Sequence, residues 1–299
     1  MSERIVLYDS ANTEYETAEL LLARWDGTRI FRLAQTPELK KEKINVVIIP
    51  PADRPVIRPA EQKQIRSSFS CFPGDGTVQV LYPQRMVEDD FGEVRGYLGW
   101  LPDEACSLIP FSEYTSDPFQ MLTAARILAN MFAAMGDDRA RLRMVDPDGF
   151  YTNTDGTRIY YLSADISDEV LSGRDGYVSY IPPELLVFNR FEEDESGPAR
   201  AADYVLSVLL YRLFVGSCPF SGENLADQIC DGISVFYDDS TPEYSTCIER
   251  LRSLDPELIP LFRLAFDYSG CSRYTTGRPT AAAWRHTLNG ILVRKHGRE

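Results

Sequence analysis

The sequence is short of histidine and of closely spaced cysteines, and each shortage excludes a class of protein. Its two histidines, His286 and His296, lie close to the C-terminal end. Neither a metal cluster nor a Ser-His or Cys-His nucleophile is expected from them, because both chemistries need further partners. The six cysteines form no C-x-x-C pair, which favours reduced thiols in a cytosol over a disulfide scaffold.

Long hydrophobic runs are also lacking. The longest candidates, Val46 to Ile49 and Val205 to Leu210, fall far short of the roughly 18 apolar residues that a membrane-spanning helix needs. No signal-like apolar stretch follows Met1. The sequence therefore predicts a cytoplasmic protein with no membrane partner.

Positive charge is scarce relative to negative charge. The chain carries 45 acidic and 31 basic residues, a formal net charge of -14. Such a field repels phosphate backbones and anionic lipids, so nucleic acid is not an expected partner. The composition is otherwise ordinary, with 44% hydrophobic residues in 299, enough for about two folding units.

The two halves of the sequence differ in pattern. Short β-like runs separated by turns extend to Trp100, whereas helical spacing begins at Asp117, a suitable N-cap before Pro118. We therefore predict an α+β chain with a β-rich part at 1–102 and a helical part at 103–299. The expected strands are Arg4–Tyr8, Ala18–Trp25, Arg29–Leu33, Ile44–Ile49, Thr77–Tyr82, Val94–Trp100 and Arg158–Leu162. The expected helices are a short one at Glu61–Phe69, a helix from Pro118 that Gly136 ends, a nearly all-round apolar helix at Ala201–Phe214, and Leu225–Cys230, Glu257–Phe266 and Ala281–Val293.

Three motifs in the second half follow the order and spacing of the C-terminal lobe of protein kinases. Tyr180-Ile181-Pro182-Pro183-Glu184 resembles the segment that ends the kinase activation loop. The stretch from Asp203 to Gly216, followed by Cys218-Pro219-Phe220, resembles the kinase central helix. Arg278-Pro279-Thr280 resembles the start of the last kinase helix. Each motif alone is common in ordinary structure, but their joint order favours the family.

The resemblance implies a bilobal protein-kinase-like fold with a β-rich N-lobe and a mainly helical C-lobe. It implies that Glu184 and Arg278 form a buried ion pair and that Asp203 hydrogen-bonds the backbone of the catalytic loop. The strands before a hinge near Trp100 to Pro102 are similar to those of bacterial kinase-like proteins. The rival interpretation is an unrelated α+β domain with a false resemblance.

The residues that phosphoryl transfer needs are missing from their expected places. A kinase needs a lysine on the phosphates, an aspartate near the substrate hydroxyl, and Asn and Asp ligands for magnesium. No G-x-G-x-x-G occurs, and the loop from Asp9 to Glu14 has no glycine. The remaining cleft candidates are Arg32 in place of the strand lysine, Asp146 as a displaced acid, Asp148 near the asparagine position, Ser163 at the metal-binding aspartate position, and Asp165 two residues later.

These replacements predict a catalytically inactive kinase-like protein, a pseudokinase, that needs no cofactor and works as a protein-binding or regulatory module. Its partner is expected to be another protein, docked near Phe220 to Ile233. Leu225, Ile229 and Ile233 recur there at helical spacing, although such a stripe also suits plain packing within the lobe. The alternative is an atypical nucleotide-dependent transferase of the kinase fold that uses rearranged acidic residues. Its metal or base groups would be Asp146, Asp148 and Asp165, with Arg32 or Arg143 on the phosphates.

Overall fold

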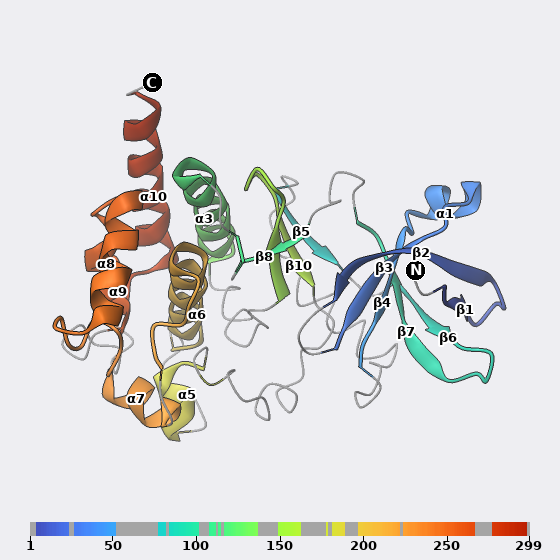
Figure 1. Cartoon of the computed structure of the whole chain (residues 1–299), viewed down its shortest axis with the longest axis horizontal. Coiled ribbons are helices and arrows are strands. Elements are labelled where there is room, and N and C mark those ends of the chain that lie inside the picture. The colour runs from blue at the N-terminus through green and yellow to red at the C-terminus, as the bar shows by residue number, and fades with distance from the viewer. Residues whose placement is uncertain are drawn as a thin grey trace. The chain divides into compact units, whose positions relative to one another are not determined.

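The structure is a computed structural model of the whole chain (Figure 1). It describes residues 4–23, 27–51, 77–81, 84–101, 108–111, 113–114, 117–136, 149–162, 178, 181–188, 197–221, 224–266 and 277–297. The chain divides into two compact units. The first unit comprises Met1–Ser70, Gln79–Leu108 and Tyr160–Asp165, and the second comprises Cys71–Val78, Ile109–Ile159 and Ile166–Glu299.

A closed antiparallel barrel forms most of the described part of the first unit. Its strands, in order around the barrel, are β1 (Val6–Tyr8), β2 (Glu14–Ala23), β3 (Arg29–Leu33), β4 (Val46–Ile49), β7 (Val94–Gly99) and β6 (Arg85–Glu88). Strand β1 pairs with both β2 and β6, and Tyr8 lies opposite Glu88. This second pairing closes the sheet on itself.

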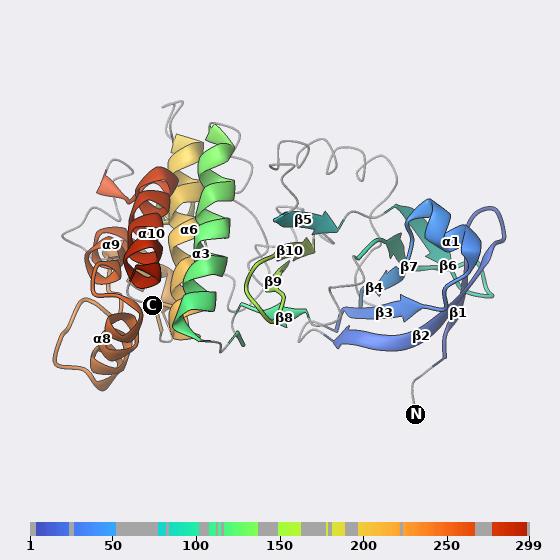
Figure 2. The same ribbon diagram turned by 90° about the horizontal axis from the view of Figure 1, so that it is seen from above.

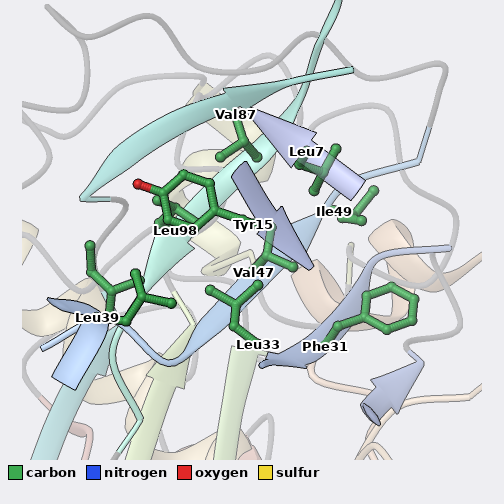
Figure 3. Packing of buried hydrophobic residues seen from close by; sticks show 10 residues of the cluster. Leu7, Tyr15, Phe31, Leu33, Leu39, Val47, Ile49, Val87 and Leu98 are labelled. Atoms are coloured by element: carbon green, nitrogen blue, oxygen red, sulfur yellow. The ribbon is translucent and has the colours of Figure 1, made fainter. Parts of the chain in front are cut away.

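Branched and aromatic side chains fill the inside of the barrel (Figure 3). All four residues of β4 are buried, as expected for a short apolar run. Two register shifts in the pairing of β2 with β3, after Thr17 and after Leu20, give the local bending that a closed barrel requires. On β7, a Cβ at Gly96 would lie 2.2 Å from the carbonyl oxygen of Ile48, so only glycine permits this close approach of strands.

The closed barrel contradicts the predicted bilobal protein-kinase-like fold with a β-rich N-lobe and a mainly helical C-lobe. The described residues contain this six-stranded barrel, a separate four-stranded sheet and eight helices. The prediction failed because alternating hydrophobicity identifies single strands and does not say which strands pair. The contact between Tyr8 and Glu88 joins residues far apart in the sequence and has no local signal.

Several local predictions are confirmed and others missed elements. Strand β3 has the predicted bounds. The missed strands are β6, β8 (Ile109–Pro110) and β9 (Phe150–Thr152), and the missed helices are α1 (Pro37–Glu42), α5 (Pro183–Phe188) and α8 (Pro242–Leu254). Helix α1 is capped by Thr36, whose side chain accepts from the Leu39 N–H. The four-stranded sheet has the order β5 (Val78–Leu81), β10 (Ile159–Leu162), β9 (Phe150–Thr152) and β8 (Ile109–Pro110).

Helices dominate the second unit. Figures 1 and 2 show α3 (Pro118–Ala134), α6 (Gly197–Val215) and α10 (Ala281–His296) side by side. Residues 201–211 of α6 are all buried, which confirms the prediction of an all-round apolar, buried helix. The remaining helices are α5 (Pro183–Phe188), α7 (Leu225–Asp231), α8 and α9 (Leu258–Phe266).

Aromatic side chains form the centre of this helical packing. Tyr211 of α6 meets Phe262 and Phe266 of α9 edge to face, with ring centroids 5.5 Å and 5.9 Å apart. The ring centroid of Trp284 on α10 lies 4.8 Å from that of Phe262. Edge-to-face pairs add stability beyond the burial of their area. None of the described helices is long and apolar enough to span a bilayer.

Candidate functional site

A groove with a volume of about 560 Å³ lies in the second unit. It is formed where the C-terminal end of α6, the loop 217–221, the loop 233–241 and the N-terminal end of α8 meet. Its size is in the range of small ligand pockets, a few hundred to a thousand Å³. It accommodates a few side chains rather than a folded domain.

Two loops shape this groove and are held in place by backbone hydrogen bonds. Helix α6 ends at Gly216, whose φ of 81° is left-handed and whose N–H donates to the Arg212 carbonyl; this confirms the predicted helix end. The Val235 N–H donates to the Pro219 carbonyl at 2.8 Å and ties one loop to the other. Buried Phe236 packs edge-on against Tyr211, which anchors the second loop to the core.

The buried groups Tyr211 and Cys247 line the groove and are uncharged at neutral pH. Burial raises the pKa of the Tyr211 hydroxyl far above its ordinary value of 10.0. Burial also raises the pKa of the Cys247 thiol above 9.0, although a hydrogen bond with Tyr211 opposes the shift. Because the thiolate is the reactive form of cysteine, Cys247 is a poor nucleophile.

The rim combines exposed apolar side chains with negative charge. Ile233 is 41% exposed and Tyr237 60% exposed, and both line the groove. Among the described lining residues the charged ones are Asp238 and Glu243. The Ser240 hydroxyl and N–H donate to Asp238 Oδ1 at 2.7 Å and 2.9 Å. These bonds lower the pKa of Asp238, so its carboxylate is ionised throughout the neutral range.

The predicted ion pair between Glu184 and Arg278 is confirmed. The two guanidinium N–H groups donate to the two carboxylate oxygens at 2.8 Å and 2.7 Å. The Arg278 side chain is fully buried and that of Glu184 is 11% exposed. Arg278 also lies over the Tyr204 ring, 5.2 Å from its centroid, and donates to the Arg200 carbonyl. The pair fixes α5 against the segment that leads into α10.

The other motif residues take local structural positions. Pro182 and Pro183 are buried, and Pro183 begins α5. Asp203 Oδ1 accepts from the Ala281 N–H at 3.0 Å and so satisfies an amide in the first turn of α10. The catalytic-loop backbone predicted as its partner lies outside the described residues.

Of the five cleft candidates, Arg32 alone lies within the described residues. Arg32 on β3 pairs with Glu19 on β2 at 3.5 Å. Asp146, Asp148, Ser163 and Asp165 lie outside the described residues.

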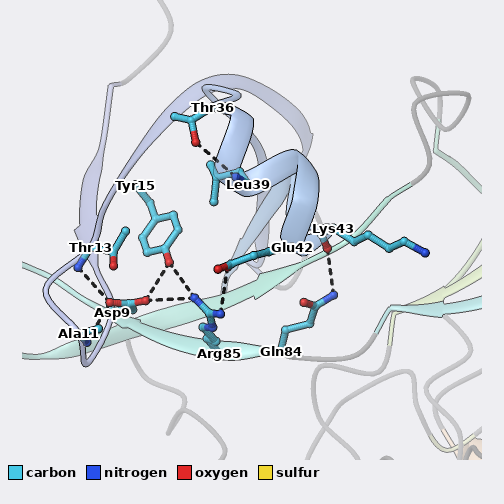
Figure 4. A network of polar contacts seen from close by, with 10 residues as sticks. All are labelled: Asp9, Ala11, Thr13, Tyr15, Thr36, Leu39, Glu42, Lys43, Gln84 and Arg85. Carbon is cyan, nitrogen blue, oxygen red and sulfur yellow. Dashed lines mark hydrogen bonds and ion pairs between the residues drawn. The ribbon is translucent and has the colours of Figure 1, made fainter.

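The loop from Asp9 to Glu14, which the sequence suggested as a candidate phosphate-binding loop, is organised around the side chain of its first residue, Asp9 (Figure 4). The carboxylate of buried Asp9 accepts from the backbone N–H groups of Ala11 and Thr13 and from the Tyr15 hydroxyl. Arg85 Nη1 lies 3.4 Å from Asp9 Oδ2, and Arg85 Nη2 lies 2.9 Å from Oε2 of Glu42 on α1. The loop amides are therefore engaged within the loop, and the network ties α1 to the barrel.

The predicted partner stripe divides between core and surface. Ile229 of α7 is fully buried, Leu225 is half-buried, and Ile233 alone of the three is exposed. The groove residues Tyr237 and Asp238 were missed, because they lie in a loop with no periodic pattern. Helix α8 had a readable signal in Thr241-Pro242, an N-cap followed by proline like the one that predicted α3.

No model of a known protein family matches the sequence, and no curated protein matches it. Within the described residues, no group of three or more His, Cys, Asp or Glu side chains is placed to hold a metal ion. The function is therefore inferred from the geometry of the groove.

Proposed function

We propose that the chain is a non-catalytic, regulatory protein-binding module whose groove receives a short segment of another protein. The observation that carries this proposal is that Ile233 and Tyr237 are exposed at the rim of the same concave site. Large apolar side chains gathered on a concave surface are typical of binding sites. Tyrosine is enriched in protein interfaces because it presents apolar area and a polar end.

The chemistry of the groove supports binding more than catalysis. Tyr211 is buried, and its pKa is raised, as is that of the Cys247 thiol. Neither group supplies a charged base or a nucleophile at neutral pH. Both instead form part of the neutral floor of the groove.

A peptide-display selection against the immobilised chain tests this proposal. We expect enriched peptides that bind the native chain and lose binding to the double variant Ile233→Asp, Tyr237→Ala. The matched control is Val293→Asp, since Val293 is also an exposed apolar residue, on α10 and outside the groove. Peptides that bind both variants equally, or a selection that enriches none, would contradict the proposal.

The nucleotide-dependent alternative has its own test, because a bound ligand raises the melting temperature. A ligand at a hundred times its Kd stabilises a fold by about 2.7 kcal/mol, a shift of very roughly 2–4 °C per kcal/mol for a unit of 150–250 residues. We expect no shift with millimolar ATP and magnesium. A metal-dependent shift that Asp165→Ala removes would favour the enzyme.

A further inference from the structure

We propose that the segment bound in the groove carries a basic side chain, lysine or arginine, beside an apolar one. This inference rests on the proposed function and adds the chemical class of the partner. It follows from the charge, capping and exposure of the lining residues.

The first observation is the sign of the charge in the groove. Asp238 and Glu243, the charged residues among the described lining residues, are both acidic. The two hydrogen bonds to the Asp238 carboxylate both use Oδ1 and come from Ser240, which leaves Oδ2 to accept from a ligand. A carboxylate that is already oriented by its neighbours loses little freedom when it binds a cation.

The N-terminal end of α8 also faces this groove and would by itself favour an anion. A helix dipole places about half a positive charge at that end. In α8 the Thr241 hydroxyl already accepts from the Tyr244 N–H at 3.1 Å, and Pro242 has no N–H. The first turn therefore has few amides left for an anion. Two full negative charges outweigh half a positive one, so the groove favours a cation.

The second observation is an exposed aromatic residue among the same lining residues. Tyr237 precedes Asp238 and is 60% exposed. The face of an exposed aromatic ring attracts a guanidinium or ammonium group electrostatically. Exposed Ile233 on the same groove gives contact area for an apolar neighbour of the cation. A ring, a carboxylate and an apolar contact together select a basic residue next to an apolar one.

The experiment uses three peptide libraries that differ at one fixed central position and have randomised apolar flanks. The centre is arginine, its neutral isostere citrulline, or glutamate. Cys218 lines the groove and is half-buried, so the rate at which iodoacetamide alkylates it, read by mass spectrometry, reports occupancy. We expect the arginine library to protect Cys218 at concentrations about tenfold lower than the citrulline library, since a hydrogen bond to a charged group is worth roughly a factor of ten or more.

Asp238→Asn should abolish this preference for arginine. Asp239→Asn is the matched control, because Asp239 is exposed, adjacent and outside the groove, and the substitution changes the net charge equally. Equal protection by all three libraries would overturn the basic partner and leave the proposed function standing. Protection by none would overturn the proposed function itself. A dimer in sedimentation that Tyr237→Ala dissociates would also overturn the inference, since a second copy would then fill the groove.

Discussion

Two aspartates show how single carboxylates organise the barrel turns. Asp9 accepts from the N–H groups of Ala11 and Thr13. Asp89, at the β6–β7 turn, accepts from Phe91 and Glu93 at the same spacing. An arginine bonds each of them, Arg85 at 3.4 Å and Arg95 at 2.7 Å. The two differ in burial, since the Asp9 side chain is 4% exposed and that of Asp89 is 18% exposed.

Asp9 should make barrel stability depend on pH. Burial acts to raise the pKa of Asp9, but hydrogen bonds from Thr13, Tyr15 and Ala11 outweigh it and lower the pKa below 3.8. A lowered folded-state pKa contributes stability above the unfolded pKa, and this is lost as pH falls through the folded value. We expect Asp9→Asn to cost about 1–3 kcal/mol at pH 7, with a difference that shrinks below pH 4.

Urea unfolding at several pH values, followed by circular dichroism, measures this dependence. Asp89→Asn is the control, and its smaller cost should reflect its more exposed side chain. A cost of Asp9→Asn that is the same at pH 7 and pH 3 would refute the assignment.

The Glu184–Arg278 pair should be costly to break from one side. Removing one partner leaves a buried charge uncompensated, so Glu184→Ala or Arg278→Ala should lower the free energy of unfolding by about 3–5 kcal/mol. The double variant should cost less than the sum of the two, because the charges that remain in the single variants are both gone.

Arg294→Ala provides the surface comparison for this pair. Arg294 pairs with Asp255 and Glu257 and its side chain is 43% exposed, so its loss should lower the free energy of unfolding far less than the loss of Arg278 does, because water screens an exposed ion pair. Unchanged urea midpoints for Arg278→Ala would show that the pair does not stabilise the fold.

At the level of elements, the distance to the neighbouring backbone decides whether a glycine can be replaced by a larger residue. Gly96 on β7 faces the backbone of β4, and its missing side chain lets the two strands approach. Gly290 on α10 has open space, since the nearest atom to an added Cβ is the end of the Arg294 side chain at 3.5 Å. The same substitution therefore has opposite expected effects at these two glycines.

Gly96→Ala should destabilise the barrel, and Gly290→Ala should stabilise the helix. An added methyl at Gly96 meets a carbonyl oxygen and forces the strands apart, at a cost of roughly 1–3 kcal/mol or more. Alanine is favoured over glycine inside a helix by about 0.8–1 kcal/mol. Thermal unfolding of both variants measures the contrast, and a neutral Gly96→Ala would mean that β4 and β7 can separate freely.

At the level of the whole molecule, the net charge of -14 sets which partners can approach. Negative fields slow the approach of polyanions and speed that of cations. On this basis we expect the chain to attract a basic segment more readily than nucleic acid.

We expect no binding of a 20-base-pair DNA duplex at 150 mM salt in a fluorescence polarisation assay. Under the same conditions an arginine-centred peptide should bind, and its affinity should fall as salt rises, because added salt shortens the range of the attraction. DNA binding, or peptide affinity that does not change between 50 mM and 500 mM salt, would contradict this electrostatic picture.

Prediction from the sequence succeeded where a few neighbouring residues decide the outcome. Asp117-Pro118 predicts the start of α3, and Gly216 marks the end of α6. The same signal at Thr241-Pro242 would have predicted α8. The groove could not be predicted from the sequence. Its lining residues extend from Tyr211 to Cys247 and come together only when α6, two loops and α8 pack.

The sequence by itself determined five of the eight described helices and most of the described strands, and the order of its motifs, through their resemblance to kinases, implied the partnership of Glu184 with Arg278. Periodicity, caps and motif order are local or linear properties, and a buried charge must find its opposite. Only the tertiary structure decided that β1 pairs with β6 to close a barrel, that Asp9 binds its own loop, and that Ile233 stays exposed while Ile229 is buried. These outcomes depend on contacts between segments far apart in the chain, whose free energies are settled together when the core packs.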